Sequence, residues 1–201
     1  MPNVKSTVKP KDPDTRARII DASAALFRHR GYAGTGLKAI VEASDAPYGS
    51  VYHFFPGGKE ELGVAALAAG GVTYRELVEL VFADGVDVVD ATRAFCAGAA
   101  TVLETTNYAD ACPIATMALE VASVSEPMRI AAARAFESWL AVLERKFTAA
   151  GMAPRQARQI AIELFCAIEG AFLLARAQRS TEAFTVIGES TAARVAAALG
   201  R

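Results

Sequence analysis

The stretch 35–62 most constrains the fold, because turn-forming residues divide it into two short helices and the start of a third. Thr35 is a favourable N-cap for the first helix, whose apolar residues recur at helical spacing. The small and polar run 44–46 predicts a tight turn, and Pro47 stands where a second helix begins, at which a missing N–H costs nothing. Pro56-Gly57-Gly58 ends that second helix. The stretch therefore predicts a helix–turn–helix followed by a longer helix.

The second short helix has an unusual composition for a buried helix. Val51 and Phe55 are predicted to face inward. The side chains then left to project outward are Tyr48, Ser50, Tyr52 and His53. Gly49 costs about 1 kcal/mol relative to Ala, but it opens the backbone to close approach by a ligand or phosphate. This helix fits recognition of a major groove, and the alternative is a helix–turn–helix that only packs within a globule.

Two motifs carry a resemblance to a known family. G-Y-x-G-T at 31–35 and P-Y-G-S-V-Y-H-F-F-P-G-G-K-E-E-L at 47–62 resemble the DNA-binding domain of TetR-type transcriptional regulators. The resemblance covers about a quarter of the chain and implies a three-helix DNA-binding domain with a larger helical domain behind it. The DNA-binding residues that it implies are Thr35, Gly36, Lys38, Pro47, Tyr48, Gly49, Ser50, Tyr52, His53 and Lys59.

One departure from the family pattern bears on DNA recognition. Pro47 and Tyr48 stand where the family often has Ser and Lys, which removes one phosphate-binding cation. The proline, the Gly57-Gly58 pair, Cys112-Pro113 and the later Ala118-Leu119-Glu120 resemble the LmrA/YxaF-like branch of the family.

The charge is unevenly distributed along the chain. The net charge is −1, but residues 1–59 hold nine Lys or Arg against five acids, a balance of +4, and residues 60–201 have a balance of −5. A basic end beside an acidic remainder fits phosphate contact at one end only. No apolar run reaches about 18 residues, and the start lacks a signal-peptide core, so we expect a cytoplasmic protein without a membrane span.

Segments with apolar residues at helical spacing, bounded by Gly, Pro and Ser at the expected helix ends, predict an all-α fold. We expect a disordered basic arm at 1–13, whose contact with DNA is left open, a helix–turn–helix DNA-binding domain at 14–62, and a helical ligand-binding and dimerisation domain at 63–201. A helix from Lys59 to about 82 crosses the boundary and is expected to transmit movement, although Gly70-Gly71 is expected to bend or break it. The further helices are expected at 87–104, 113–124, 126–150, 154–179 and 182–199.

The second domain offers a candidate effector site. By analogy with the resembled family, and with core packing as the alternative for each, the ligand-binding candidates are Phe95, Cys112, Met117, Trp139, Phe165, Glu169 and Phe172. Glu169 is distinctive, since a carboxylate between two phenylalanines is costly to bury unless it is paired. Aromatic and methionine walls suit a small hydrophobic effector.

Small residues at helical spacing mark the last two helices. In the resembled family these helices pair across a two-fold axis, and the alternative is a small-residue face inside one subunit. The candidate dimer-interface residues are Ala167, Gly170, Ala171, Leu174, Ala183, Ile187, Ser190 and Ala193. A homodimer is favoured because one short recognition helix reads few base pairs.

These patterns together predict a ligand-responsive repressor that binds a near-palindromic operator as a homodimer. The three cysteines are far apart and far from both histidines, so we expect no metal, no cofactor and no catalytic residue. The alternatives are a helical protein-interaction scaffold and a small helical enzyme that uses Cys112 or Glu169. The enzyme is disfavoured because no histidine follows His53 to activate a cysteine.

Overall fold

The computed structural model describes residues 14–201, and the expected arm at 1–13 lies outside this range. Over the described residues the chain forms nine α-helices and no strand, so the all-α prediction is confirmed. The helices are α1 (Asp14–Arg30), α2 (Leu37–Ser44), α3 (Tyr48–Phe54), α4 (Gly58–Val81), α5 (Val88–Thr105), α6 (Pro113–Val121), α7 (Glu126–Ala149), α8 (Pro154–Gln178) and α9 (Glu182–Ala198).

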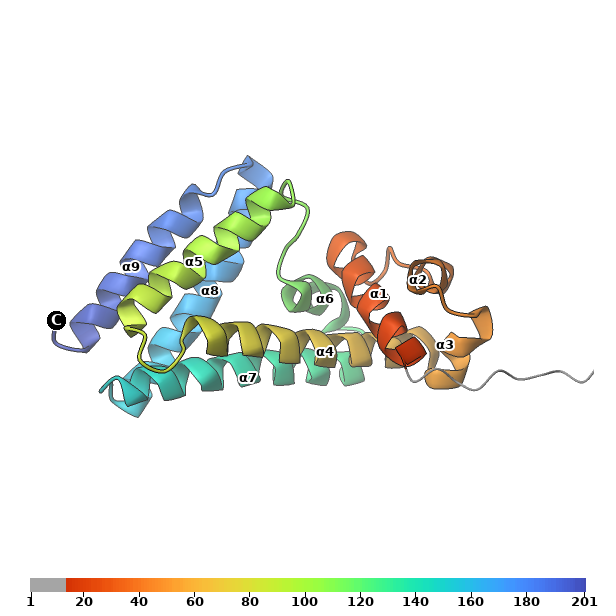
Figure 1. The fold of residues 1–201 in the computed structure, drawn as a ribbon, viewed down its shortest axis with the longest axis horizontal. Helices are drawn as coiled ribbons and strands as arrows, with labels where there is room; N and C mark the ends of the chain where they lie inside the picture. The colour runs from red at the N-terminus through yellow and green to blue at the C-terminus, as the bar shows by residue number, and fades with distance from the viewer. Residues whose placement is uncertain (1–13) are drawn as a thin grey trace, which may run out of the picture.

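The helices form two lobes along the long axis of the molecule (Figure 1). The smaller lobe at one end contains α1, α2 and α3, and the larger lobe stacks α5, α8 and α9 at the other end. α4 and α7 run side by side lengthwise, and α6 lies between α1 and the larger lobe. α4 therefore begins against the smaller lobe and ends inside the larger one.

The expected break of α4 at Gly70-Gly71 is wrong, because α4 is one continuous helix. A Cβ added to Gly71 would lie 2.8 Å from the Cβ of Ala135 on α7. The indole Nε1 of Trp139 donates a hydrogen bond of 2.8 Å to the carbonyl oxygen of Gly71. The missing side chain thus serves close packing of two helices, which a propensity argument does not detect.

Most of the residues that were predicted to cap or end a helix do so. Gly31 closes α1 with a φ of +73°, and the hydroxyl of Ser125 caps α7 by accepting a hydrogen bond from the amide of Met128. Thr35 is an exception, since Gly36 is the N-cap residue of α2. The Thr35 hydroxyl instead donates a hydrogen bond of 2.8 Å to the carbonyl oxygen of Gly31, which anchors the α1–α2 turn.

Within residues 14–201, none of the helices combines the length and the apolar character that crossing a bilayer needs.

Candidate functional site

The smaller lobe carries α2 and α3 at the end of the molecule that faces away from the larger lobe (Figure 1). Asp45, in the left-handed conformation with a φ of 48°, makes the turn that joins α2 to α3. Val51 and Phe55 are each 1% exposed, which confirms their predicted inward orientation. The guanidinium of Arg16 on α1 lies 5.3 Å from the centroid of the Phe55 ring and braces this packing.

The opposite face of α3 is open to a partner. Tyr48 is 61% and Tyr52 is 52% exposed, and their ring centroids lie 6.5 Å apart, one turn of helix from each other. His53 is exposed and Ser50 is half-buried. A Cβ added to Gly49 would meet nothing within 4 Å, so the backbone there is accessible. This face presents hydrogen-bonding groups and flat rings to solvent.

The remaining DNA-binding candidates have different environments. Gly36 and Pro47 are exposed at the helix starts, and the Lys38 side chain is 83% exposed. Thr35 is fully buried, with its hydroxyl bonded inside the lobe, so its side chain is not available to a partner.

Lys59 lies at the junction between the lobes. Its ammonium sits 4.2 Å from the centroid of the Tyr32 ring. Burial lowers the pKa of Lys59, and the nearby carboxylate of Glu120 partly opposes that effect. A phosphate contact by Lys59 would therefore compete with its packing on Tyr32.

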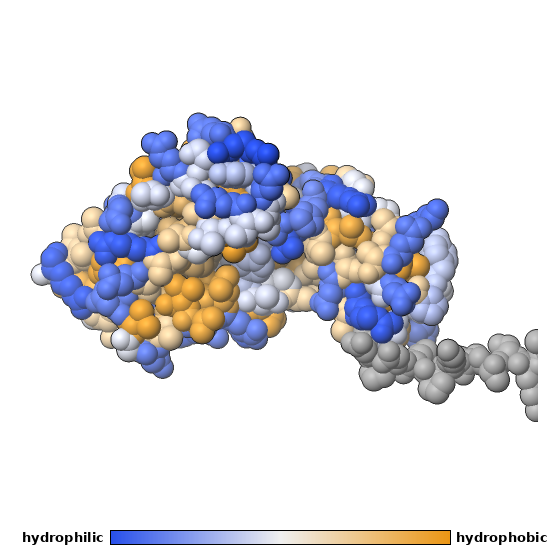
Figure 2. All heavy atoms as spheres, turned by 45° about the horizontal axis from the view of Figure 1, so that its top comes forward, coloured by the Kyte–Doolittle hydropathy of each residue, from blue (hydrophilic) through white to orange (hydrophobic). Residues whose placement is uncertain are grey.

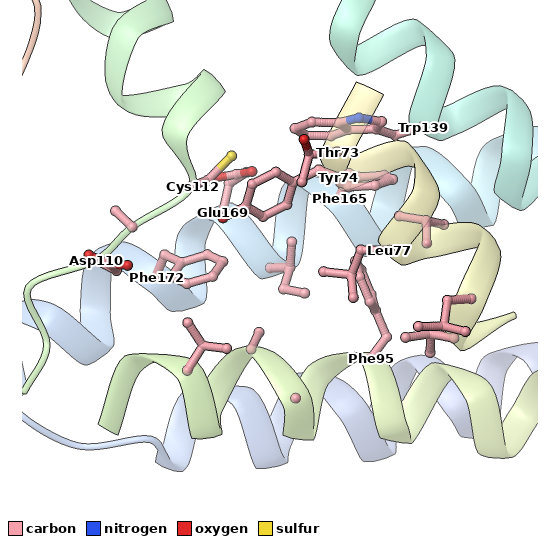
Figure 3. Close-up of a pocket in the computed structure, with 18 of the residues that line it drawn as sticks. Thr73, Tyr74, Leu77, Phe95, Asp110, Cys112, Trp139, Phe165, Glu169 and Phe172 are labelled. Atoms are coloured by element: carbon pink, nitrogen blue, oxygen red, sulfur yellow. The ribbon is translucent and has the colours of Figure 1, made fainter. Parts of the chain in front are cut away.

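The larger lobe contains a cavity of about 600 Å³ lined by α4, α5 and α8, with α1, α7 and the segment before α6 completing its wall (Figure 3). Six of the seven ligand-binding candidates line it, namely Phe95, Cys112, Trp139, Phe165, Glu169 and Phe172. The seventh, Met117, is buried and lines a separate hollow of about 230 Å³ between α1, α4 and α6.

Five aromatic side chains line the cavity, namely Tyr74, Phe95, Trp139, Phe165 and Phe172. Trp139 stacks on Phe165 with a centroid distance of 5.7 Å and an interplanar angle of 28°. Phe95 meets Phe165 edge-on at 6.1 Å. The mouth is apolar as well, since Leu77 and Leu80 are 43% and 73% exposed. Figure 2 shows a contiguous apolar area on the larger lobe, and such a surface favours a flat apolar ligand.

Glu169 is one of three acidic residues that line the cavity and lies beside Cys112 (Figure 3). Burial raises the pKa of Glu169, and the Cys112 thiol, which hydrogen-bonds to the carboxylate, opposes part of that rise. Burial together with the neighbouring Glu169 raises the pKa of Cys112 well above its ordinary value. The thiol is therefore neutral rather than a reactive thiolate, which argues against nucleophilic chemistry here.

A polar cluster at one end of the cavity connects it to the smaller lobe. Arg28, in the last turn of α1, places its Nε 3.2 Å from an oxygen of Asp110, and His29 Nε2 lies 3.2 Å from the other oxygen. Arg28 also hydrogen-bonds to the hydroxyl of Tyr74 on α4. Arg28, Tyr74 and Asp110 all line the cavity, and sequence reasoning missed all three. Their surroundings in sequence show no periodicity or motif that marks them.

α6 makes a second connection between the lobes. The Glu120 carboxylate accepts hydrogen bonds from the backbone amides of Tyr32 and Ala33, at 3.0 and 2.7 Å. Close by, the Ser125 hydroxyl donates a hydrogen bond of 2.6 Å to Glu60 in the first turn of α4. The α1–α2 turn and the start of α4 are thus both attached to the larger lobe.

The dimer-interface candidates divide between two faces of α8 and α9. Gly170, Leu174, Ser190 and Ala193 are exposed, whereas Ala171 is buried in the subunit core. The other three, Ala167, Ala183 and Ile187, are half-buried. The exposed face also carries Leu173 and Val186, which are 71% and 59% exposed.

A helix–turn–helix lobe joined by a continuous helix to a lobe with an apolar cavity is the arrangement typical of a helix–turn–helix transcriptional regulator. The profile of bacterial regulatory proteins of the tetR family matches residues 19–66, and that of the LmrA/YxaF-like C-terminal domain matches residues 88–190. The chain therefore belongs to the TetR family, in its LmrA/YxaF-like branch.

Relatives and solved structures agree with this assignment. The chain is 35% identical to the uncharacterized HTH-type transcriptional regulator YxaF of Bacillus subtilis, over 88% of this chain and 92% of the relative. It is 32% identical to the HTH-type transcriptional regulator LmrA of the same organism, over 80% and 86%. A TetR regulator from Legionella pneumophila shares the fold with a TM-score of 0.80 at 20% identity, over 92% of this chain and 99% of the other. The matched family models and relatives are transcriptional regulators and not enzymes.

Proposed function

We propose that this regulator is a repressor that binds a near-palindromic operator as a homodimer and is released by a small, apolar effector. One observation carries the proposal: α1 and α4 are shared between the lobe that exposes α3 and the wall of the cavity. A ligand in the cavity would therefore contact α1 and α4, the helices that support the DNA-reading face. A scaffold that binds only protein would not need this arrangement.

The proposed DNA contacts come from the exposed face of α3. Tyr48, Tyr52 and His53 read base edges, and the open backbone at Gly49 allows close approach to the groove. Lys38 and Lys59 contact phosphates, which positions the lobe without reading sequence. Because operator DNA is the partner, the protein acts in the cytoplasm.

The proposed dimer forms through the exposed apolar face of α8 and α9. Leu173, Leu174 and Val186 give this face large apolar side chains, and Gly170 and Ala193 permit close helix approach. Two-fold pairing would present two α3 helices to one side of the DNA. Their half-sites must lie about 34–36 Å apart, or a multiple of that distance, to face successive major grooves.

Release follows if the effector binds better to the conformation that does not fit the operator. A ligand in the cavity presses on Tyr74 of α4 and on the Arg28–Asp110 pair, which hold α1. Displacing these groups tilts α1 and α4, and the two α3 helices lose their register on the DNA.

The direct test is electrophoretic retardation of the DNA upstream of the protein's own gene. We expect a retarded complex with that DNA and none with a scrambled fragment of equal length and composition. Retardation of both fragments alike, or of neither, would contradict sequence-specific operator binding.

A further inference from the structure

We propose that the cavity selects apolar cations, in which an ammonium group carried on a hydrophobic body binds to Glu169. The proposal rests on the proposed effector function of the cavity and adds the chemical class of its ligand. It arises from the charges of the cavity wall, where four ionisable side chains of the Arg, Asp and Glu types occur, namely Arg28, Glu76, Asp110 and Glu169.

Three of these four groups do not attract a cation into the interior. Arg28 and Asp110 form an ion pair at 3.2 Å, and His29 supplements it from the other side of Asp110. Glu76 is exposed at the mouth, where water screens its charge. Within residues 14–201, Glu169 is therefore the interior carboxyl group without a basic partner. Among the described residues its protein partner is the Cys112 thiol, which is neutral.

This arrangement decides between classes of ligand by charge. An anion would be repelled by Glu169, because Arg28, the guanidinium of the wall, is already paired with Asp110. A neutral ligand would remove water from the Glu169 carboxylate without supplying a compensating charge. Such desolvation is costly in an apolar site. A cation replaces the lost hydration with an opposite charge and restores the ionised state that burial disfavours.

The aromatic wall supports the same class. Phe165 and Phe172 occupy the same face of α8 as Glu169, one turn on either side of it. Phe95 and Trp139 continue the wall around Phe165. Aromatic faces attract ammonium groups through their quadrupoles, and more strongly where water is excluded. A carboxylate surrounded by rings therefore fits an apolar amine better than it fits a lipid-like neutral molecule.

The test uses three compounds of nearly equal shape: 4-phenylbutylamine, 4-phenylbutanol and 4-phenylbutyrate. Trp139 is the one tryptophan of the chain and lines the cavity, so quenching of its emission reports occupancy. At pH 7.5 the amine is charged, and we expect it to bind at least about tenfold more tightly than the alcohol, with the acid weakest. Glu169→Gln, which keeps shape and hydrogen bonding, should remove the preference for the amine. Glu76→Gln, which removes the same charge at the mouth, should retain it.

Three outcomes would overturn the proposal: equal binding of amine and alcohol, a preference that survives Glu169→Gln, and no binding of any of the three compounds. Operator retardation measured with the same unliganded samples tests the DNA-binding function separately. A protein that retards its operator but shows no amine preference refutes the cation proposal alone.

Discussion

Asp110 and Arg28 face each other at 3.2 Å across the junction between the cavity wall and the last turn of α1. Asp110 is buried, and it precedes the start of α6, whereas Arg28 belongs to the lobe that carries α3. A buried carboxylate needs such a partner, so this contact is one of those that fix the relative position of the two lobes, beside the Glu120 and Ser125 hydrogen bonds. A ligand that breaks the Arg28–Asp110 contact would therefore shift α1 and, with it, the lobe that carries α3.

Asp110→Asn should uncouple the cavity from the operator. The carboxamide keeps the shape but removes the charge that holds Arg28, so occupancy no longer pulls on α1. In the parent protein we expect 4-phenylbutylamine to weaken operator binding by about 5–150-fold, the usual range of allosteric coupling. In the variant this ratio should fall towards one, while quenching of Trp139 by the amine persists.

The matched control is Asp84→Asn, which removes an exposed carboxylate paired with Lys146 at 2.7 Å, away from the junction. It should leave the ratio of operator affinities with and without amine unchanged. An Asp110→Asn protein that responds like the parent would show that α4 alone carries the signal.

Tyr52→Ala tests the reading face of α3. Tyr52 is 52% exposed and supports no core packing, so stability should change little. Loss of a base-edge contact costs about 1–3 kcal/mol, so we expect operator affinity to fall by about 5–150-fold. Leu119→Ala, at an 88% exposed site on α6, is the control and should bind the operator normally. An unchanged Kd for Tyr52→Ala would remove Tyr52 from the interface.

The extent of sequence prediction differs between the two lobes. In the smaller lobe, Pro47, Gly31 and the spacing of Val51 and Phe55 are local signals, and the structure follows them. Thr35 shows the limit of local reasoning. Threonine is a favourable N-cap residue. In the folded protein, however, the Thr35 hydroxyl donates a hydrogen bond to the carbonyl oxygen of Gly31 in the preceding turn.

In the larger lobe, residues on one helix face were predictable, and polar pairs between distant segments were not. Phe165, Glu169 and Phe172 are brought to one wall by helical periodicity, which the sequence displays. Arg28 and Asp110 meet across 82 positions of chain, and each stands in a segment of ordinary surface composition. Only the tertiary packing of α1 against the segment before α6 makes them a pair.

Charges placed on the exposed face of α8 should prevent dimerisation. Leu173 and Leu174 are 71% and 50% exposed in the single chain, and burying a glutamate there without a partner is costly. The double variant Leu173→Glu, Leu174→Glu should have the mass of one chain by light scattering at micromolar concentration. The parent protein and Leu119→Glu should both have twice that mass. A parent protein that is itself monomeric would contradict the homodimer.

Glu169→Gln should stabilise the ligand-free protein at neutral pH. Burial raises the pKa of Glu169 in the folded state above its value in the unfolded chain, so ionisation opposes folding. The stability contributed by the protonated form is present below the unfolded pKa and is lost as the pH rises through the folded pKa. Glutamine is neutral throughout and suffers no such loss.

The measurement is the melting temperature of both proteins between pH 4 and pH 8. Each kcal/mol gained should raise the melting temperature by about 2–4 °C for a chain of this size. The difference should grow as the pH rises and vanish at the acidic end, where Glu169 is protonated. Asp110, His29 and Glu76 are the same in both proteins, and the thiol of Cys112 remains neutral because its pKa is raised. A difference that is constant with pH would mean that Glu169 acts only through its shape, and the carboxylate would then not be the charge that selects the ligand.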